Sequence, residues 1–347
     1  MARMKVLVLF GGTSIENEQS LRSASAVIGA LSEEKYELVP VGISKKGRWV
    51  YFPGDVSEII DGSWEQNPDC SPAILSPDPA HRGILVLEDD TFSLKRIDII
   101  FSLLHGNYGE DGSVQGLCEL SHIPYIGNGI LGSAVCRNKA MAHQILTASG
   151  IRTPKWYSIL QRDLSRLEIK CEDVENSLGY PVFIKPASCD AAKGTGIANN
   201  REELVKAVKL AFTQDSTVLI EQLITGRELR IGVFGYDMPF ASFVGEMVKD
   251  ENGEEKLLVP TDIDDTAHSI IREIAIQAYT ALDCKELALF DFFYAENGEI
   301  LLGEVNTMPA LAEDAPYPML MNDLGMRYSY LLEKLIEQAL EHADRGF

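Results

Sequence analysis

The sequence LALFDFFYAENGEILLGEVN fills residues 287–306 and contains two strand-like apolar runs separated by a short polar segment. Asn297-Gly298 lies between the runs, and Asn-Gly is the dipeptide most typical of a two-residue hairpin turn. In such a hairpin Glu296 pairs with Glu299, and the two runs lie antiparallel. The segment therefore predicts part of an antiparallel sheet.

Counting outward from the turn places Asp291 directly opposite Glu304. Asn306 lies two residues beyond Glu304 and shares its face, because side chains alternate along a strand. Two carboxylates and an amide oxygen suit Mg²⁺, which proteins hold with few side chains together with substrate phosphates. The alternative is a set of solvated side chains on an exposed sheet face. The direct cross-strand match and the apolar flanking residues favour the metal site.

Composition limits the class of protein and its partners. The chain has 347 residues, enough for two or three domains, and a formal net charge of −21. This charge argues against nucleic acid or an anionic membrane as a partner, and an anionic ligand then needs a local group of Lys, Arg or metal. The six cysteines form no Cys-x-x-Cys pair, which is typical of reduced thiols in a cytoplasmic protein. No apolar run is long enough to cross a bilayer.

The first third of the chain alternates strand and helix patterns. Strands are expected at Lys5–Phe10, Tyr36–Ile43 and Ile97–Leu104, with an amphipathic helix at Ser20–Leu31. This order predicts a parallel α/β domain with its functional residues at the carboxyl ends of the strands. Residues 53–82 are rich in Pro, Asp and Ser and are expected to form an irregular excursion.

The rest of the chain changes in character after Gly127-Asn128-Gly129. Short strands are expected at Tyr180–Pro186 and Val218–Gln222, and antiparallel patterns dominate from Arg227 onward. An amphipathic helix over Tyr328–His342 closes the chain.

Two lysines are candidate phosphate ligands. Lys185 ends an apolar strand and precedes a loop containing Lys193 and Gly194, where small residues allow backbone N–H groups to approach phosphate oxygens. Lys139 is the second candidate. The alternatives are a plain turn and a surface lysine, and the strand-terminal position of Lys185 favours phosphate binding.

The segment Glu221-Gln222-Leu223 ends a strand, as a hinge that contacts an adenine edge would. Its backbone and Glu221 could bond the base, and Glu228 could take the ribose hydroxyls. Capping or surface acids are the alternative, which the residues alone do not exclude.

Polar residues follow two strands of the first domain. Glu16 begins a helix after Gly11-Gly12-Thr13-Ser14, where it would repel a pyrophosphate and suit a substrate's ammonium group; a capping acid is the alternative. His105 and Glu110 lie in a second strand-tip loop and should face the same crevice, although a structural His satisfied by backbone is the default for His105.

Together these features resemble the ATP-grasp superfamily and, within it, the D-alanine–D-alanine ligase family, over nearly the whole chain. The specific motifs are Phe-Gly-Gly-Thr-Ser-x-Glu at 10–16, Leu-His-Gly-x-x-Gly-Glu-Asp-Gly-x-x-Gln-Gly at 104–116 and Gly-Glu-Val-Asn-Thr-x-Pro at 303–309. The resemblance implies an α/β ATP-grasp fold of three domains: a parallel α/β domain over 1–127, a small central α+β domain over 128–223 and a C-terminal antiparallel α+β domain over 224–347.

The resemblance also implies roles for the candidate residues. In the family pattern Lys139 and Lys185 bind the phosphates, Glu221, Gln222 and Leu223 bind the adenine, and Glu228 binds the ribose. Asp291, Glu304 and Asn306 bind two Mg²⁺ ions, with Mn²⁺ as an alternative. Glu16 binds the amino group of the first substrate, with His105 nearby. Family enzymes phosphorylate a carboxylate and let an amine attack the acyl phosphate. Small-molecule substrates and a homodimer through the first domain are implied as well.

The sequence departs from the family pattern at four places. Asp190–Gly194 replaces a Gly-Ser-Ser-x-Gly motif, and Leu289 replaces an arginine that stabilises the tetrahedral intermediate. Pro309–Ala315 lacks the serine that binds the second substrate, and the lid loop is shortened to Gly245–Gly253. Arg230 could restore a cation near the phosphates, and a surface arginine is the alternative.

We therefore expect an ATP-dependent, ADP-forming ligase with an intact nucleotide half and a rebuilt dipeptide-forming half. The profile is similar to the mycosporine-like amino acid ligases, which activate an oxygen on a cyclohexenone ring and let an amino acid form an imine there. That reaction has no acyl oxyanion, which would explain Leu289. The alternatives are a D-alanine–D-alanine or D-alanine–D-serine ligase of peptidoglycan precursor synthesis, and a catalytically silent ATP-binding paralogue.

Overall fold

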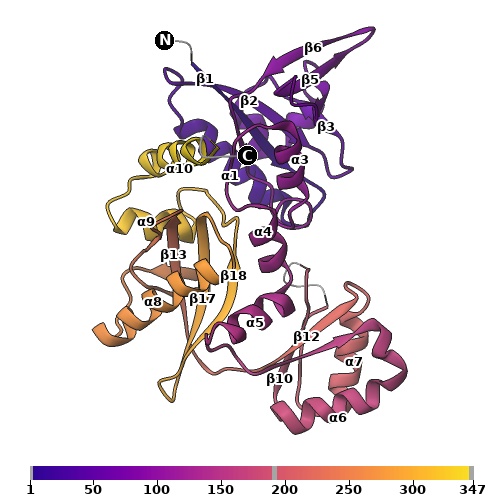
Figure 1. The fold of residues 1–347 in the computed structure, drawn as a ribbon, viewed down its shortest axis with the longest axis vertical. Helices are drawn as coiled ribbons and strands as arrows, with labels where there is room; N and C mark the ends of the chain where they lie inside the picture. The colour runs from indigo at the N-terminus through magenta and orange to yellow at the C-terminus, as the bar shows by residue number, and fades with distance from the viewer. Residues whose placement is uncertain (1–2, 190–193, 344–347) are drawn as a thin grey trace.

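Three β-sheets, each built from a separate part of the chain, organise the molecule (Figure 1). The computed structural model describes residues 3–189 and 194–343. The sheets comprise β1–β8, β9–β12 and β13–β18 in chain order, which confirms the expected α/β class with a parallel first sheet. The domain boundaries at 127/128 and 223/224 stay predictions.

The first sheet has a parallel centre and an antiparallel extension. The parallel strands are β1 (Met4–Gly11), β2 (Tyr36–Ile43), β7 (Ile99–Ser102) and β8 (Tyr125–Ile126). The antiparallel strands are β3 (Trp49–Tyr51), β4 (Ser71–Leu75), β5 (Gly83–Glu88) and β6 (Thr91–Arg96). The accompanying helices are α1 (Asn17–Ala30), α2 (Val56–Asp61), the 3₁₀ helix η1 (Ser63–Gln66) and α3 (Ser113–Ser121).

The segment 53–82 is more regular than expected, since it contains α2, η1 and β4. A capping box between Asp55 and Glu58 begins α2. Trp64 is buried, and its ring lies 5.0 Å from the ring of Phe10 on β1. The expectation of an irregular excursion was wrong because tertiary packing, which composition does not report, stabilises these short elements.

The central sheet is antiparallel and lies between helices and the candidate site. It contains β9 (Trp156–Leu160), β10 (Val182–Pro186), β11 (Gly196–Ala198) and β12 (Thr217–Gln222), with η2 (Gln161–Arg166), α6 (Leu167–Leu178) and α7 (Arg201–Ala211). Ile184 and Ile220 pack with residues of α6 and α7 in one core. Because side chains alternate along a strand, Lys185 and Glu221 point to the opposite face.

The third sheet carries the candidate metal residues. Its strands are β13 (Gly226–Gly235), β14 (Phe240–Ala241), β15 (Gly245–Lys249), β16 (Glu255–Leu258), β17 (Glu286–Ala295) and β18 (Ile300–Asn306). The remaining helices of the molecule are α4 (Ile130–Arg137), α5 (Lys139–Ala148), α8 (Asp265–Ala281), α9 (Pro316–Asp323) and α10 (Tyr328–Ala343). Phe290 and Phe292 pack toward α8 in the second core cluster. Asp291 therefore faces the opposite side, away from α8.

The hairpin β17–β18 reaches the expected register by another route. Ala295 N–H donates to Glu299 O, so the loop has three residues and the expected pairing of Glu296 with Glu299 was wrong. A β-bulge then shifts the register by one residue between Asp291 and Phe292. The two one-residue shifts cancel, and Asp291 lies opposite Glu304 as predicted.

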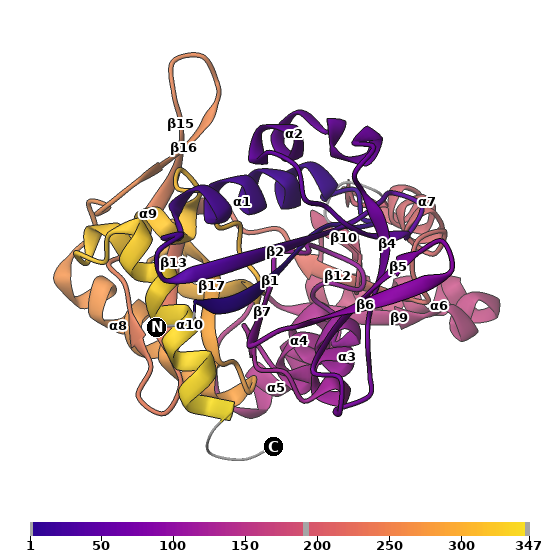
Figure 2. The ribbon, with the colours of Figure 1, turned by 90° about the horizontal axis from the view of Figure 1, so that it is seen from above.

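The end of the chain returns to the first sheet. Helix α10 lies beside the first domain in Figure 1, and its buried residues share one core cluster with strand β1. Figure 2 shows the hairpin β15–β16 projecting away from the body of the molecule. No helix within residues 3–189 and 194–343 is long and apolar enough to cross a membrane.

Candidate active site

The candidate site begins at an acid pair on neighbouring strands. Asp291 of β17 lies opposite Glu304 of β18, and both side chains are about half exposed, at 42% and 44%. Gly303 makes this possible: a Cβ there would lie 2.8 Å from the Phe293 ring and 3.3 Å from Asp291 O. A bulge with glycine at its close approach therefore brings both carboxylates to one face.

Each of these acids is paired with a cation. Lys139 begins α5, and its backbone N–H donates to Ala187 O at 2.9 Å, which ties the helix to the end of β10. From there its Nζ lies 3.1 Å from Glu304 Oε1. Arg230 of β13 lies directly opposite Asp291, and its Nε is 3.1 Å from Asp291 Oδ1.

Lys185 and Glu221 form a buried ion pair at 2.8 Å. Burial lowers the pKa of the Lys185 ammonium, but the carboxylates of Glu221 and Glu304 outweigh this effect and raise the pKa above its usual value. Burial likewise raises the pKa of Glu221, and Lys185 together with His143 overrides it, so the pKa lies below its usual value. Both partners are therefore charged at neutral pH.

The acid pair fits a magnesium ion shared with phosphates. Asp291 Oδ1 is shielded from solvent, and the Arg230 guanidinium is the cation beside it. Desolvation raises the pKa of Asp291 to about 6, and Arg230 only partly opposes this. No cluster of three or more His, Cys, Asp or Glu forms a metal site in the described part of the chain. A set of two carboxylates and one amide is what Mg²⁺ uses when phosphates supply further oxygens.

A cavity of about 180 Å³ joins the nucleotide and metal candidates. Lys185, Glu221, Glu228, Arg230, Asp291 and Glu304 all line it, together with Phe183, Leu229, Phe292, Phe293 and Gly303. Positive and negative side chains from the central and the third sheet therefore face one cavity.

A second cavity, of about 100 Å³, also borders Glu304. Glu16 and Glu110 of the first domain line it together with Lys139 and Asn306. Asn306 Oδ1 also accepts a hydrogen bond from Met308 N–H at 2.9 Å. Glu304 borders both cavities: Glu16, the expected ammonium-binding acid, lines one of them together with Lys139, and Lys185 lines the other.

His105 is buried between the first and third sheets. Its Nδ1 lies 3.0 Å from Met308 O and 3.3 Å from Glu110 Oε1, and its Nε2 lies 3.4 Å from Ser23 Oγ. These contacts give His105 a structural role in joining the domains, and a catalytic role stays a prediction.

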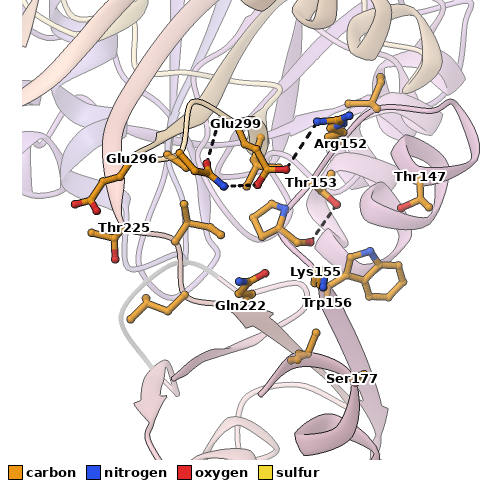
Figure 3. Close-up of a pocket in the computed structure, with 18 residues that line it drawn as sticks. Thr147, Arg152, Thr153, Lys155, Trp156, Ser177, Gln222, Thr225, Glu296 and Glu299 are labelled. Carbon is orange, nitrogen blue, oxygen red and sulfur yellow. Dashed lines mark hydrogen bonds and ion pairs between the residues drawn. The ribbon is translucent and has the colours of Figure 1, made fainter. Parts of the chain in front are cut away.

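The hinge residues face a third and larger cavity, of about 740 Å³ (Figure 3). Gln222 and Leu223 line it, together with Trp156, residues 295–297 and Glu299, whereas the Glu221 side chain faces the 180 Å³ cavity. The backbone N–H of Gln222 already donates to Lys155 O at 2.8 Å. Adenine binding by Gln222 and Leu223 stays a prediction.

The loop after β10 is described only in part. Lys193 lies outside the described residues, as do Ala191 and Ala192. Gly194 has φ +85°, and a Cβ there would lie 3.1 Å from Pro186 Cγ, so this turn requires glycine.

The departures from the family pattern have clear positions. Leu289 is 7% exposed and lies opposite Gly232 and Asn306, two residues before Asp291 on the same face. Leu311 is buried, and its N–H donates to Ser23 Oγ at 3.2 Å. Position 289 therefore carries a buried apolar side chain, and the backbone N–H of residue 311 is hydrogen-bonded within the protein.

Sequence reasoning missed His143. It lies on α5 four residues after Lys139, and its Nε2 is 2.6 Å from Glu221 Oε1. The spacing of four residues on one helix places His143 on the same face as Lys139, which is the pattern that could have identified it.

Comparison with known proteins gives two family matches along the chain. Residues 5–128 match the family described as D-ala D-ala ligase N-terminus, and residues 145–337 match D-ala D-ala ligase C-terminus. A D-alanine–D-alanine ligase from Thermoanaerobacter sp. (strain X514) is 39% identical over 353 residues, covering 98% of this chain and 98% of the relative.

Solved structures of ligases in this family align with nearly the whole chain. VanG D-Ala:D-Ser ligase from Enterococcus faecalis aligns with a TM-score of 0.91 at 33% identity, covering 97% of this chain and 100% of that one. The D-alanine-D-alanine ligase from Coxiella burnetii aligns with a TM-score of 0.88 at 28% identity, covering 99% and 97%. The fold is thus that of the ATP-grasp ligases. The chain belongs to the D-alanine–D-alanine ligase family and is an ATP-dependent, ADP-forming carbon–nitrogen ligase.

Proposed function

We propose that this chain joins two D-amino acids, with D-alanine as the first substrate and D-alanine or D-serine as the second. The observation that carries the proposal is that Glu304 lines both small cavities. ATP phosphates beside Lys185 on one side and an amino acid held by Glu16 on the other would meet at this carboxylate. The named relatives act on such substrates, which supports the same class here.

The chemistry follows from that arrangement. A carboxylate oxygen of the first amino acid bonds to the γ-phosphorus as the bond to ADP breaks, which gives an acyl phosphate. The amine of the second amino acid then bonds to the acyl carbon, phosphate leaves, and the nitrogen loses a proton. Lys139 and Lys185 would balance the phosphate charge. Mg²⁺ held by Asp291, Glu304 and Asn306 would neutralise the transferring group.

The imine-forming hypothesis is not supported. Its main support is Leu289 in place of the family arginine, and none of the relatives reported above belongs to the mycosporine-like branch. Arg230 offers another explanation, because it faces the same cavity beside Asp291 and could supply the missing cation. Homodimerisation, a second Mg²⁺ ion and the use of Mn²⁺ also stay predictions.

The test measures ADP release and product mass with ATP and Mg²⁺ present. Three mixtures are compared: D-alanine alone, D-alanine with D-serine, and mycosporine-glycine with L-serine. ADP and a dipeptide from either of the first two mixtures would support the proposal. Turnover only with the third would restore the imine hypothesis, and ATP binding without turnover in any mixture would indicate a silent paralogue.

A further inference from the structure

A buried histidine lies behind the Lys185–Glu221 pair and belongs to none of the expected site residues. Glu221 Oε2 lies 2.8 Å from Lys185 Nζ, and its other oxygen, Oε1, lies 2.6 Å from His143 Nε2. One carboxylate thus uses one oxygen for the lysine and the other for the histidine. The orientation of the carboxylate is set by both.

His143 has no other polar anchor among the described residues. It is 2% exposed, and its Nδ1 is shielded from solvent without a hydrogen bond in the described part of the chain. A nitrogen that donates to a carboxylate carries a proton, so the proton on Nε2 is fixed by Glu221. Buried polar atoms nearly always have partners, and an unpaired one calls for a functional explanation.

Two elements hold the ring in this position. The Trp156 indole stacks on it with ring centroids 5.6 Å apart and an interplanar angle of 25°. Trp156 of β9 is the cross-strand partner of Glu221 on β12, so the indole reaches the ring from the sheet side. Helix α5 supplies the ring from the other side, one turn after Lys139.

We propose that His143 is a positioning residue that holds Glu221, and through it Lys185, in the place where the ammonium meets the nucleotide phosphates. The inference rests on the proposed function, because it takes Lys185 as a phosphate ligand. Without His143, one oxygen of a carboxylate that is 6% exposed would lose its donor. The carboxylate would then turn, and the ammonium would lose its fixed partner.

The experiment compares ATP affinity by calorimetric titration in the full chain. His143→Leu should weaken ATP binding by roughly 10- to 100-fold, the range expected for a lost hydrogen bond to a charged group. His143→Gln, which keeps an N–H donor, should restore most of the affinity. The KM for ATP should rise while the KM for D-alanine stays unchanged. His81→Leu, which removes a histidine bonded to Ser76 Oγ far from the site, should leave ATP binding unchanged.

A double-mutant cycle separates positioning from a merely structural role. If His143 acts through Lys185, then His143→Leu adds little to the loss already caused by Lys185→Met. Fully additive losses, or wild-type affinity in His143→Leu, would overturn the inference. If His143→Leu does not fold, His143→Asn is used instead, since its amide is too short to reach Glu221.

The two proposals fail in different ways. Unchanged ATP affinity in Lys185→Met would refute the nucleotide site and the role of His143 with it. Weakened binding in Lys185→Met alone, with normal binding in His143→Leu, would refute only the role of His143.

Discussion

The charged side chains of the site neutralise one another, and the pairs differ in how easily they exchange partners. Lys139–Glu304 and Arg230–Asp291 involve carboxylates that are 44% and 42% exposed. Ion pairs with such exposure contribute about 0–1 kcal/mol, so metal and phosphates can replace them at little cost. Lys185–Glu221 is buried, and removing one partner of a buried pair is far more damaging. The site thus combines one buried ion pair, Lys185–Glu221, with two half-exposed ion pairs that metal and phosphates can replace.

The acid pair gives the first prediction. Asp291→Asn and Glu304→Gln should each reduce ADP release by at least about 100-fold, because loss of a metal ligand removes charge stabilisation in the transition state. Mn²⁺ binding, measured by electron paramagnetic resonance in the presence of ATP, should weaken in parallel. Glu88→Gln, at the exposed end of β5, is the control and should behave as wild type. Near-normal turnover in either acid variant would refute the metal assignment.

Arg230 gives the second prediction. If it supplies the cation that Leu289 does not, Arg230→Met should lower kcat by roughly 100- to 1,000-fold, the loss typical of one oxyanion donor. The KM for D-alanine should change little, since the arginine would act on the transition state. Steady-state ADP release measures both constants. Arg201→Met, which removes an ion pair with Glu175, is the matched control. A normal kcat in Arg230→Met would leave the missing family arginine without a replacement.

At the scale of elements, the hairpin β17–β18 shows how far a sequence argument reaches. The two runs and the Asp291–Glu304 pairing were predicted correctly, because alternation and turn chemistry are local properties. The three-residue loop and the bulge at Gly303 were not, and their shifts cancel. A bulge depends on what packs above it, here the Phe293 ring, so the local sequence does not reveal it.

The bulge gives the third prediction. Gly303→Ala should lower ATP-dependent turnover and the melting temperature together, because the new Cβ would lie 2.8 Å from the Phe293 ring and the strand must shift. The shift moves Glu304, the next residue. Gly29→Ala in α1 is the matched control, since nothing lies within 4 Å of its Cβ, and it should be neutral or stabilising by about 0.5–1 kcal/mol. Wild-type turnover in Gly303→Ala would show that the acids do not depend on the bulge.

Contacts between elements distant in sequence were the other part that could not be predicted. The strand β10 and the strand β12 were each expected, yet the sequence did not show that Glu221 would pair with Lys185. A contact of Glu221 with an adenine base stays a prediction. The sequence did not indicate a role for His143, because its partner Glu221 lies 78 residues further along the chain. Motif positions thus located the elements of the site, whereas the pairing of its charges required the structure.

At the scale of the whole molecule, a few buried polar residues join the first and third sheets. Asn128 Nδ2 donates to Leu287 O at 2.7 Å and to Thr307 O at 2.8 Å, and its Oδ1 accepts from Lys285 N–H at 2.7 Å. Beside it, Gly127 N–H donates to Glu286 Oε2 at 2.7 Å. These bonds hold the start of β17 and the end of β18 against residues 127 and 128, directly after the last strand of the first sheet.

Glu286 gives the last prediction, which concerns stability and not turnover. The side chain is 3% exposed, and burial raises its pKa well above the usual value of 4.5, although the Gly127 N–H opposes this. Between 4.5 and the raised pKa, the unfolded chain releases a proton that the folded chain keeps. The free energy of unfolding therefore falls as pH rises through this window and levels off above it.

Glu286→Gln removes that titration while keeping an oxygen for Gly127 N–H. Thermal melts from pH 5 to 9 should show similar melting temperatures for wild type and variant at the acid end. At the alkaline end the variant should melt higher, and a gain of about 1 kcal/mol corresponds to roughly 2–4 °C. Glu88→Gln, at the exposed end of β5, should leave the curve unchanged. A variant that melts lower than wild type at pH 8 would mean that the Glu286 carboxylate is ionised and stabilises the contact between the first and third sheets.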